Sequence, residues 1–141
     1  MDTIRRGNAA EAAVLNAMVR ADFHVFTPFG EGAPYDLLVD TNSELIRVQV
    51  KCARLKGECL LFNSCSTDHG QGRLSYDGRA DVFGVYSPQI DRVYAIPVQD
   101  CPRFQTSLRL VPTRNSQSKG VRYAGDYAVE SWAASLSRAA A

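Results

Sequence analysis

The amino-acid sequence predicts an α/β fold of the mixed, α+β type, in which a leading helix is followed by several strands and a second helix closes the chain. Three observations predict it: apolar residues recur at helical spacing near the N-terminus, short stretches in the middle alternate apolar and polar residues, and an alanine-rich segment ends the chain. The 141 residues, 45% hydrophobic and 22% charged, suffice for a single domain spanning residues 1–141.

The first predicted element is a helix over residues 7–21, GNAAEAAVLNAMVRA, in which Val14 and Met18 belong to one apolar face. Asn8 is placed to cap this helix, and Glu11 follows it by three residues, which is the spacing of a capping box. Glu11 therefore has two open interpretations, as the partner of Asn8 in the cap or as a functional carboxylate.

Several short stretches are predicted to be strands, because they alternate or are apolar and bounded by turn residues. Residues 35–40 and 45–53 flank the turn TNSE and are expected to pair as antiparallel neighbours. The apolar stretch CLLFN, residues 59–63, is expected to join the same sheet. The full set of expected strands is 23–28, 35–40, 45–53, 59–63, 82–86 and 92–96.

Two polar, glycine-containing stretches, residues 64–73 and 112–120, are predicted to be exposed loops. Residues 124–139 are predicted to form the final helix, with Trp132 and Leu136 packed on the body and the last alanines fraying. The sequence contains no internal repeat, linker or low-complexity block, so nothing in it indicates a second domain.

The stretch RVQVKCA places Arg47, Gln49 and Lys51 at every second position of a predicted strand, and therefore on one face of it. Such a face is either solvated surface or part of a site. If the strand pairs with residues 35–40, Asp36 approaches Gln49 and Lys51, and the first helix can bring Glu11 to the same end of the sheet. Two carboxylates, an amide and an ammonium group would then lie together.

These groups suit the hydrolysis of a phosphodiester. Carboxylate and amide oxygens are hard ligands that can hold Mg²⁺, a metal-bound water can serve as the nucleophile, and a lysine can orient that water or offset charge on the phosphate. Asp36, Glu11 and Gln49 would supply the oxygens, and Lys51 would supply the cation.

Three segments occur in the order of a known family's motifs: the helix carboxylate in GNAAE, then PYD at residues 34–36, then QVK at residues 49–51. Through them the chain resembles the PD-(D/E)XK nuclease superfamily. More narrowly, it is similar to the bacterial group I intron-encoded homing endonucleases built on that core, and this likeness spans most of the chain. It rests on the segments MDTIRRGNAAEAAVL, YDLLVD, RVQVK, DVFGVY, RVYAIPV and YAGDY.

The resemblance implies a restriction-endonuclease-like core, with a mixed central sheet, a leading helix and flanking helices. It implies a homing endonuclease that cleaves specific sites in double-stranded DNA and depends on Mg²⁺, for which Mn²⁺ can substitute. Asp36, Gln49 and Glu11 would be the metal ligands, and Lys51 the catalytic lysine of the motif. Gln49 departs from the motif, which normally has an acidic residue there, and a neutral ligand would weaken metal binding.

A net charge of +1 does not mark the whole chain as a nucleic-acid binder, so DNA contact requires a local basic patch. Cutting both strands also favours a two-fold assembly, a homodimer or a homotetramer. The residues expected to contact DNA lie in or beside the polar loops and the strand ends: Arg54, Lys56, Arg73, Arg79, Arg114, Lys119 and Arg122.

Other functions stay open at this point. On the same core, the chain could be a branched-DNA (Holliday junction) resolvase or a repair nuclease, or, given Gln49, a catalytically inactive DNA-binding module. An enzyme that uses thiol chemistry would need a cysteine nucleophile with His24 or His69 as its base, and nothing in the sequence places either histidine beside a cysteine.

The four cysteines show no CxxC spacing and are expected to be reduced thiols. Cys59, Cys65 and His69 match no zinc-binding pattern. The N-terminus lacks the apolar run of a signal peptide, and no segment is long and apolar enough for a membrane span. The protein is expected to be cytoplasmic, and either bacterial or phage-associated.

Overall fold

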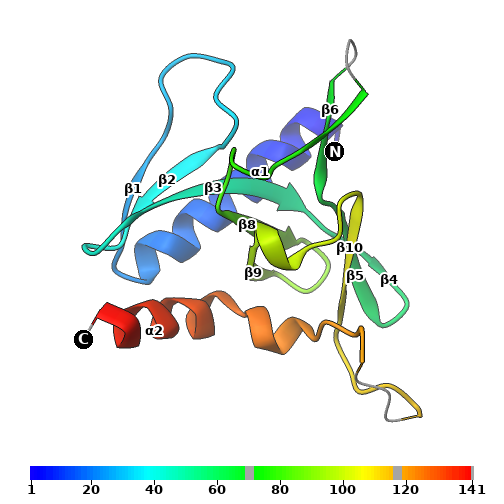
Figure 1. Cartoon of the computed structure of the whole chain (residues 1–141). Coiled ribbons are helices and arrows are strands. Elements are labelled where there is room, and N and C mark those ends of the chain that lie inside the picture. Colours follow the sequence, from blue (N-terminus) through cyan, green and yellow to red (C-terminus); the bar gives the residue numbers. More distant parts are fainter. Residues whose placement is uncertain (69–71, 116–118, 141) are drawn as a thin grey trace.

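A five-stranded mixed sheet forms the centre of the structure, a computed structural model that describes residues 1–68, 72–115 and 119–140. Its strands lie in the order β1-β2-β3-β8-β9 (Figure 1). Strands β3 and β8 are parallel, and the other neighbours are antiparallel. The strands are β1 (His24–Phe26), β2 (Leu37–Asp40), β3 (Leu45–Cys52), β8 (Val82–Ser87) and β9 (Arg92–Pro97).

Helix α1 (Thr3–Arg20) crosses one face of this sheet and buries Ala10, Val14 and Met18 against it. The helix begins earlier than predicted, because the side chain of Asp2 caps it by accepting a hydrogen bond from the backbone N–H of Arg5 at 2.8 Å. The predicted capping box of Asn8 and Glu11 is therefore wrong. Asn8 lies inside the helix, and Glu11 is left without a capping role.

Gly84 allows α1 to lie close to strand β8. A Cβ atom at this position would lie 2.6 Å from Cγ1 of Val14 and 3.0 Å from Cγ1 of Val48, which is closer than packed atoms tolerate. The helix and the sheet could not keep their present separation with a larger residue there.

We expect Gly84→Ala to lower the free energy of unfolding by about 1–3 kcal/mol, the usual cost of overpacking a core. Urea denaturation of both forms measures this. The matched control is Gly125→Ala, because a Cβ at Gly125 would meet no atom within 4 Å. Equal stability of the two alanine variants would contradict the close packing of α1 on β8.

A second, three-stranded antiparallel sheet has the order β10-β5-β4; β4 and β5 follow β3 in the chain, and β10 joins them after β9. Its strands are β4 (Arg54–Lys56), β5 (Cys59–Asn63) and β10 (Gln105–Arg109). The expectation that residues 59–63 join the central sheet is thus wrong: β3 already has β2 on one edge and β8 on the other. Strand β5 instead turns back on β4 through Gly57, whose φ of +61° suits glycine.

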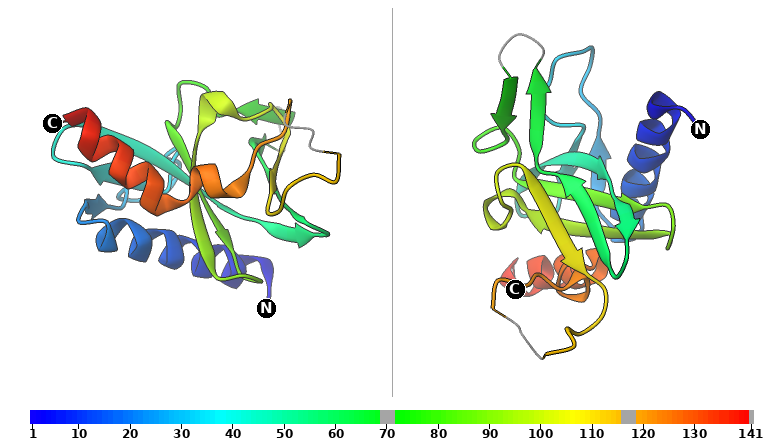
Figure 2. Two further views of the ribbon diagram at one scale, coloured as in Figure 1. Left: turned by 90° about the horizontal axis from the view of Figure 1, so that it is seen from below. Right: turned by 90° about the vertical axis from the view of Figure 1, so that its right-hand side faces the viewer.

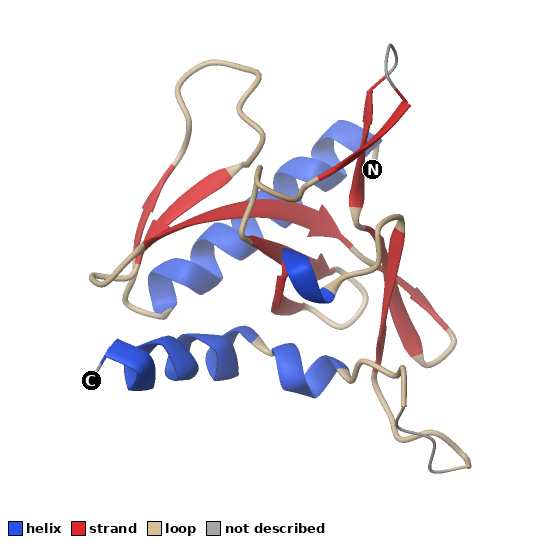
Figure 3. Ribbon diagram, in the orientation of Figure 1, coloured by secondary structure: helices blue, strands red, loops and turns tan. Residues whose placement is uncertain are grey.

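The stretch predicted as an exposed loop, residues 64–73, contributes to a β-hairpin made of β6 (Cys65–Asp68) and β7 (Gly72–Ser75). Figure 3 shows these two strands extending away from the body of the protein. The stretch has no clear apolar alternation because most of the hairpin does not pack on the core. Ser64 and Cys65, at its base, are buried.

The C-terminal part passes around the edge strand β9. A 3₁₀ helix, η2 (Ala124–Tyr127), packs on one core cluster, and α2 (Val129–Ala140) packs on the other. Figure 2 shows the course of these two helices from two sides. Trp132 of α2 meets Phe23 edge-on, with ring centroids 6.0 Å apart. The predicted packing of Trp132 and Leu136 on the body is confirmed. Among the described residues, neither helix has the length and apolar character needed to cross a bilayer.

Candidate active site

Asp36 lies directly before β2, at the start of its pairing with β3. Its backbone N–H donates to the carbonyl of Val48, and its carboxylate oxygen Oδ2 accepts from the backbone N–H of Val50, both at 2.9 Å. Leu37 is opposite Val48 in the ladder, so the same register places Asp36 opposite Gln49. The carboxylate is thus held on the strand that carries the QVK segment.

Asp36 and Glu11 are close enough to influence each other's charge. Burial raises the pKa of Asp36, and the Val50 N–H and the Lys51 ammonium only partly offset this. The pKa of Glu11 is also raised, first by burial and then by repulsion from Asp36. Two partly buried carboxylates, both with a raised pKa, are a suitable environment for a cation.

Gln49 lies on the same face of β3 as Lys51 and is half-buried. Within the described part of the chain its side chain makes no hydrogen bond, so its amide oxygen is available as a ligand. No group of three or more His, Cys, Asp or Glu residues in that part could hold a metal ion. The candidate ligand set is therefore two carboxylates and one amide. These hard oxygen donors fit a divalent cation that keeps several waters, such as Mg²⁺.

Lys51 is held at the base of the β6–β7 hairpin. Its Nζ donates to the hydroxyl of Tyr76 at 3.2 Å and to the carbonyl of Cys65 at 3.4 Å, and it lies 4.7 Å from the centre of the Tyr76 ring. Cys65 opens β6 and Tyr76 directly follows β7, so one contact comes from each side of the hairpin. No pattern in the sequence indicates this contact, because Tyr76 is 25 residues away from Lys51.

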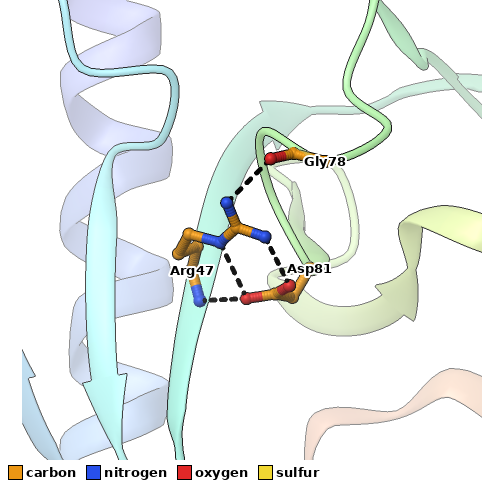
Figure 4. A network of polar contacts seen from close by, with 3 residues as sticks. All are labelled: Arg47, Gly78 and Asp81. Atoms are coloured by element: carbon orange, nitrogen blue, oxygen red, sulfur yellow. Dashed lines mark hydrogen bonds and ion pairs between the residues drawn. The ribbon is translucent and has the colours of Figure 1, made fainter.

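Arg47, the remaining polar residue on this face of β3, has a structural role. Its guanidinium forms two hydrogen bonds to the carboxylate of Asp81, at 2.9 and 3.1 Å, and one to the carbonyl of Gly78 at 2.9 Å (Figure 4). These contacts hold the pKa of Asp81 below its ordinary value. The alternation of polar residues on β3 thus has two causes: Arg47 anchors the turn before β8, and Gln49 and Lys51 face the candidate site.

The basic residues proposed to contact DNA are not gathered in one patch. Arg54 and Lys56 are exposed on β4, and Arg73 is exposed on β7, where it lies over the ring of Phe104 at 5.2 Å. Arg79 is half-buried and lies 5.5 Å from the centre of the Tyr76 ring. Of this first group, Arg79 contacts Tyr76, whereas Lys56 lies at the far end of β4, where the register through Cys59 brings it next to the end of β10 at Arg109.

The second group lies on the segment that follows β10. Arg114 and Lys119 are exposed there, and Arg122 donates from Nε to the carbonyl of Asp100 at 2.8 Å. Figure 1 and the right view of Figure 2 show this segment and the β6–β7 hairpin pointing in opposite directions. A DNA duplex bound to the β6–β7 hairpin alone would therefore not meet this group.

The structure does not favour thiol chemistry. All four cysteines are free thiols, and burial raises the pKa of Cys52 and of Cys101, which opposes formation of the reactive thiolate. His24 is exposed on the edge strand β1, while His69 lies outside the described residues.

Comparison with known proteins identifies a family and a similar fold. The model of a family described as PD-(D/E)XK endonuclease matches residues 1–130. Among solved structures, the fold is similar to that of a bacterial homing endonuclease, I-Ssp6803I, with a TM-score of 0.72 and 21% sequence identity, over 99% of this chain and 94% of that one. No curated protein matches the sequence. The predicted mixed α/β architecture is confirmed.

Proposed function

Because this chain belongs to the PD-(D/E)XK endonuclease family, we propose that it is a metal-dependent, site-specific endonuclease that cleaves phosphodiester bonds in double-stranded DNA. Nucleases of this family generally use divalent metal ions. The observation that carries the proposal is the arrangement at the start of the β2–β3 pair, where Asp36 is coupled electrostatically to Glu11 and to Lys51. Similarity to a bacterial homing endonuclease supports the homing role.

In the proposed site, oxygens of Asp36, Glu11 and Gln49 would hold Mg²⁺, for which Mn²⁺ can substitute. A bound ion would neutralise charge and activate a water molecule for attack on phosphorus. The carboxylate of Asp36 is oriented by the Val50 N–H, so it needs little rearrangement to act as a ligand. The ammonium of Lys51 would offset the charge that develops on the scissile phosphate.

DNA would be held by contacts to its phosphates around the end of β3, from both β4 and the β6–β7 hairpin. Arg54 and Lys56 follow Lys51 closely along the chain, and Arg73 is exposed on β7, so these are the proposed first contacts. Because one site cuts one strand, we propose a homodimer or a homotetramer as the active form. The second group, Arg114, Lys119 and Arg122, would contact DNA away from the hairpin, on the same protomer or through such an assembly.

Incubation with supercoiled plasmid DNA, with and without Mg²⁺, tests the proposal. We expect nicked and then linear product only when the metal is present. Selection of cleaved targets from a random DNA library should identify one recognition sequence and show whether that sequence is symmetric. Preferential cleavage of a synthetic four-way junction would indicate a resolvase instead. DNA retention in a gel shift without cleavage, in Mg²⁺ and in Mn²⁺, would identify an inactive binding module.

The neutral side chain of Gln49 gives a prediction about metal affinity. Gln49→Glu is expected to bind Mg²⁺ more tightly than the natural protein, because it adds a negative ligand, and Gln49→Ala is expected to bind it more weakly. Isothermal titration calorimetry measures both, with the exposed Gln99→Glu as the control for added charge alone. Absence of metal affinity in all these forms would count against the proposed site.

A further inference from the structure

The ammonium of Lys51 has two fixed acceptors among the described residues, the hydroxyl of Tyr76 and the carbonyl of Cys65. A lysine ammonium has three N–H donors, so one donor is left for a group in the site. The Nζ atom also lies over the ring of Tyr76, where the aromatic face attracts a cation. Tyr76 thus contacts the ammonium through its hydroxyl and through its ring.

Tyr76 is itself held in place by its surroundings, so it can fix the position of the Lys51 ammonium. Its side chain is only 6% exposed, and its ring packs edge-on against Phe83 at 5.4 Å. Its backbone carbonyl accepts hydrogen bonds from the N–H groups of Arg79 and Ala80, at 2.9 and 3.0 Å. These contacts leave the ring little freedom to rotate or shift.

The turn that begins at Tyr76 is tied to β3 at both of its ends. Tyr76 contacts Lys51 at one end, and Gly78 and Asp81 are bound by Arg47 at the other (Figure 4). The backbone N–H of Asp81 also donates to the carbonyl of Arg47 at 2.9 Å. Hydrogen bonds therefore hold segment 76–81 against β3, the strand that carries the candidate catalytic lysine.

We infer that Tyr76 is a positioning residue of this site, which holds the Lys51 ammonium so that its remaining N–H points at the reacting phosphate. This inference rests on the proposed function for its effect on cleavage, but not for the geometry. The hydroxyl contributes through the hydrogen bond, and the ring contributes through packing and attraction for the cation. Loss of either should let the lysine side chain sample rotamers that are not productive.

Kinetics of four proteins test the coupling: the natural chain, Tyr76→Phe, Lys51→Met and the double variant. We measure single-turnover cleavage of supercoiled plasmid DNA in Mg²⁺. Tyr76→Phe should lower the rate about tenfold, as expected for one hydrogen bond to a charged group. In the Lys51→Met background, Tyr76→Phe should alter the rate less than about twofold, because the ammonium group through which Tyr76 acts is absent. Tyr127→Phe, on the 3₁₀ helix η2, is the control for loss of a tyrosine hydroxyl.

Nuclear magnetic resonance gives a second readout that does not depend on activity. In the natural protein the two Hε protons of Lys51 should be inequivalent and shifted by the ring current of Tyr76, unlike those of the exposed Lys56 and Lys119. Tyr76→Phe should keep part of this shift, and Tyr76→Leu should abolish it. The Lys51→Met variant assigns the signal, since it alone lacks that resonance.

The two readouts separate the inference from the proposed function. A shifted and inequivalent Lys51 signal in a protein that cuts no DNA would support the positioning and refute the nuclease. Averaged Lys51 protons in the natural protein would overturn the positioning, even if the protein is an active nuclease. An equal loss of rate from Tyr76→Phe with and without Lys51 would also overturn it, because Tyr76 would then act by another route.

Discussion

Replacement of Lys51 by methionine is expected to lower the single-turnover rate of DNA cleavage about a thousandfold, within the range lost when a positioned charged or proton-transferring group is removed. Methionine keeps much of the apolar stem and removes the ammonium. The phosphate would then lose the ammonium group that is proposed to offset its developing charge. The pKa of Asp36 should rise further, because Lys51 is one of the groups that lower it.

The measurement is a time course on supercoiled plasmid DNA at saturating protein, alongside a gel shift in Ca²⁺ to report DNA affinity. Lys56→Met, on the exposed strand β4, is the matched comparison. We expect Lys56→Met to weaken DNA binding without changing the cleavage rate of the bound complex. Lys51→Met should lower that cleavage rate without weakening DNA binding. Equal cleavage rates in the natural protein and in Lys51→Met would show that Lys51 takes no part in the chemical step.

Asp36→Asn is expected to abolish metal-dependent cleavage and at the same time to stabilise the metal-free protein. Burial raises the pKa of Asp36, so its ionised form is less favourable in the folded chain than in the unfolded chain. Ionised Asp36 therefore lowers the free energy of unfolding at pH values above its folded pKa, and the neutral amide removes that penalty. An asparagine oxygen can still accept the hydrogen bond from Val50.

Urea denaturation in EDTA at neutral pH measures the gain in stability, and titration with Mg²⁺ should show that the metal stabilises only the natural protein. The difference between the two proteins should shrink as the pH falls through the raised pKa of Asp36, because the aspartate then becomes neutral too. Asp126→Asn, at an exposed carboxylate, should leave the stability unchanged. A large loss of stability in Asp36→Asn would show that Asp36 is a structural residue.

The candidate site could be predicted from the sequence largely because its elements are local. The turn TNSE joins β2 and β3 directly, so alternation along the two strands places Asp36 and Gln49 opposite each other. The position of Glu11 near Asp36 depends on how α1 packs on the sheet. The sequence allowed the first helix to bring Glu11 to this end of the sheet, but no spacing along the chain fixes that position.

Features that depend on contacts between distant parts of the chain could not be predicted in this way. The parallel pairing of β3 with β8 excludes β5 from the central sheet, and nothing in CLLFN reveals which edge is free. The β6–β7 hairpin has polar residues where a packed strand would have apolar ones. Tyr76 reaches Lys51 only because this hairpin returns to the end of β3.

The face of β3 illustrates the same limit. Alternation showed that Arg47, Gln49 and Lys51 share a face, but it could not distinguish a structural arginine from residues of a site. That distinction required the position of Asp81, whose carboxylate binds Arg47 with two hydrogen bonds. The chemistry of a polar strand face is therefore decided by its partners in space.

The most direct test of the proposed metal site is paramagnetic broadening of amide resonances by Mn²⁺, because it locates the bound ion. We expect signals of Asp36, Gln49, Val50 and Glu11 to broaden first at low Mn²⁺, and excess Mg²⁺ to restore them. Broadening centred elsewhere, such as on the exposed Glu44 beside Asp40, or the absence of any localised effect, would contradict the site.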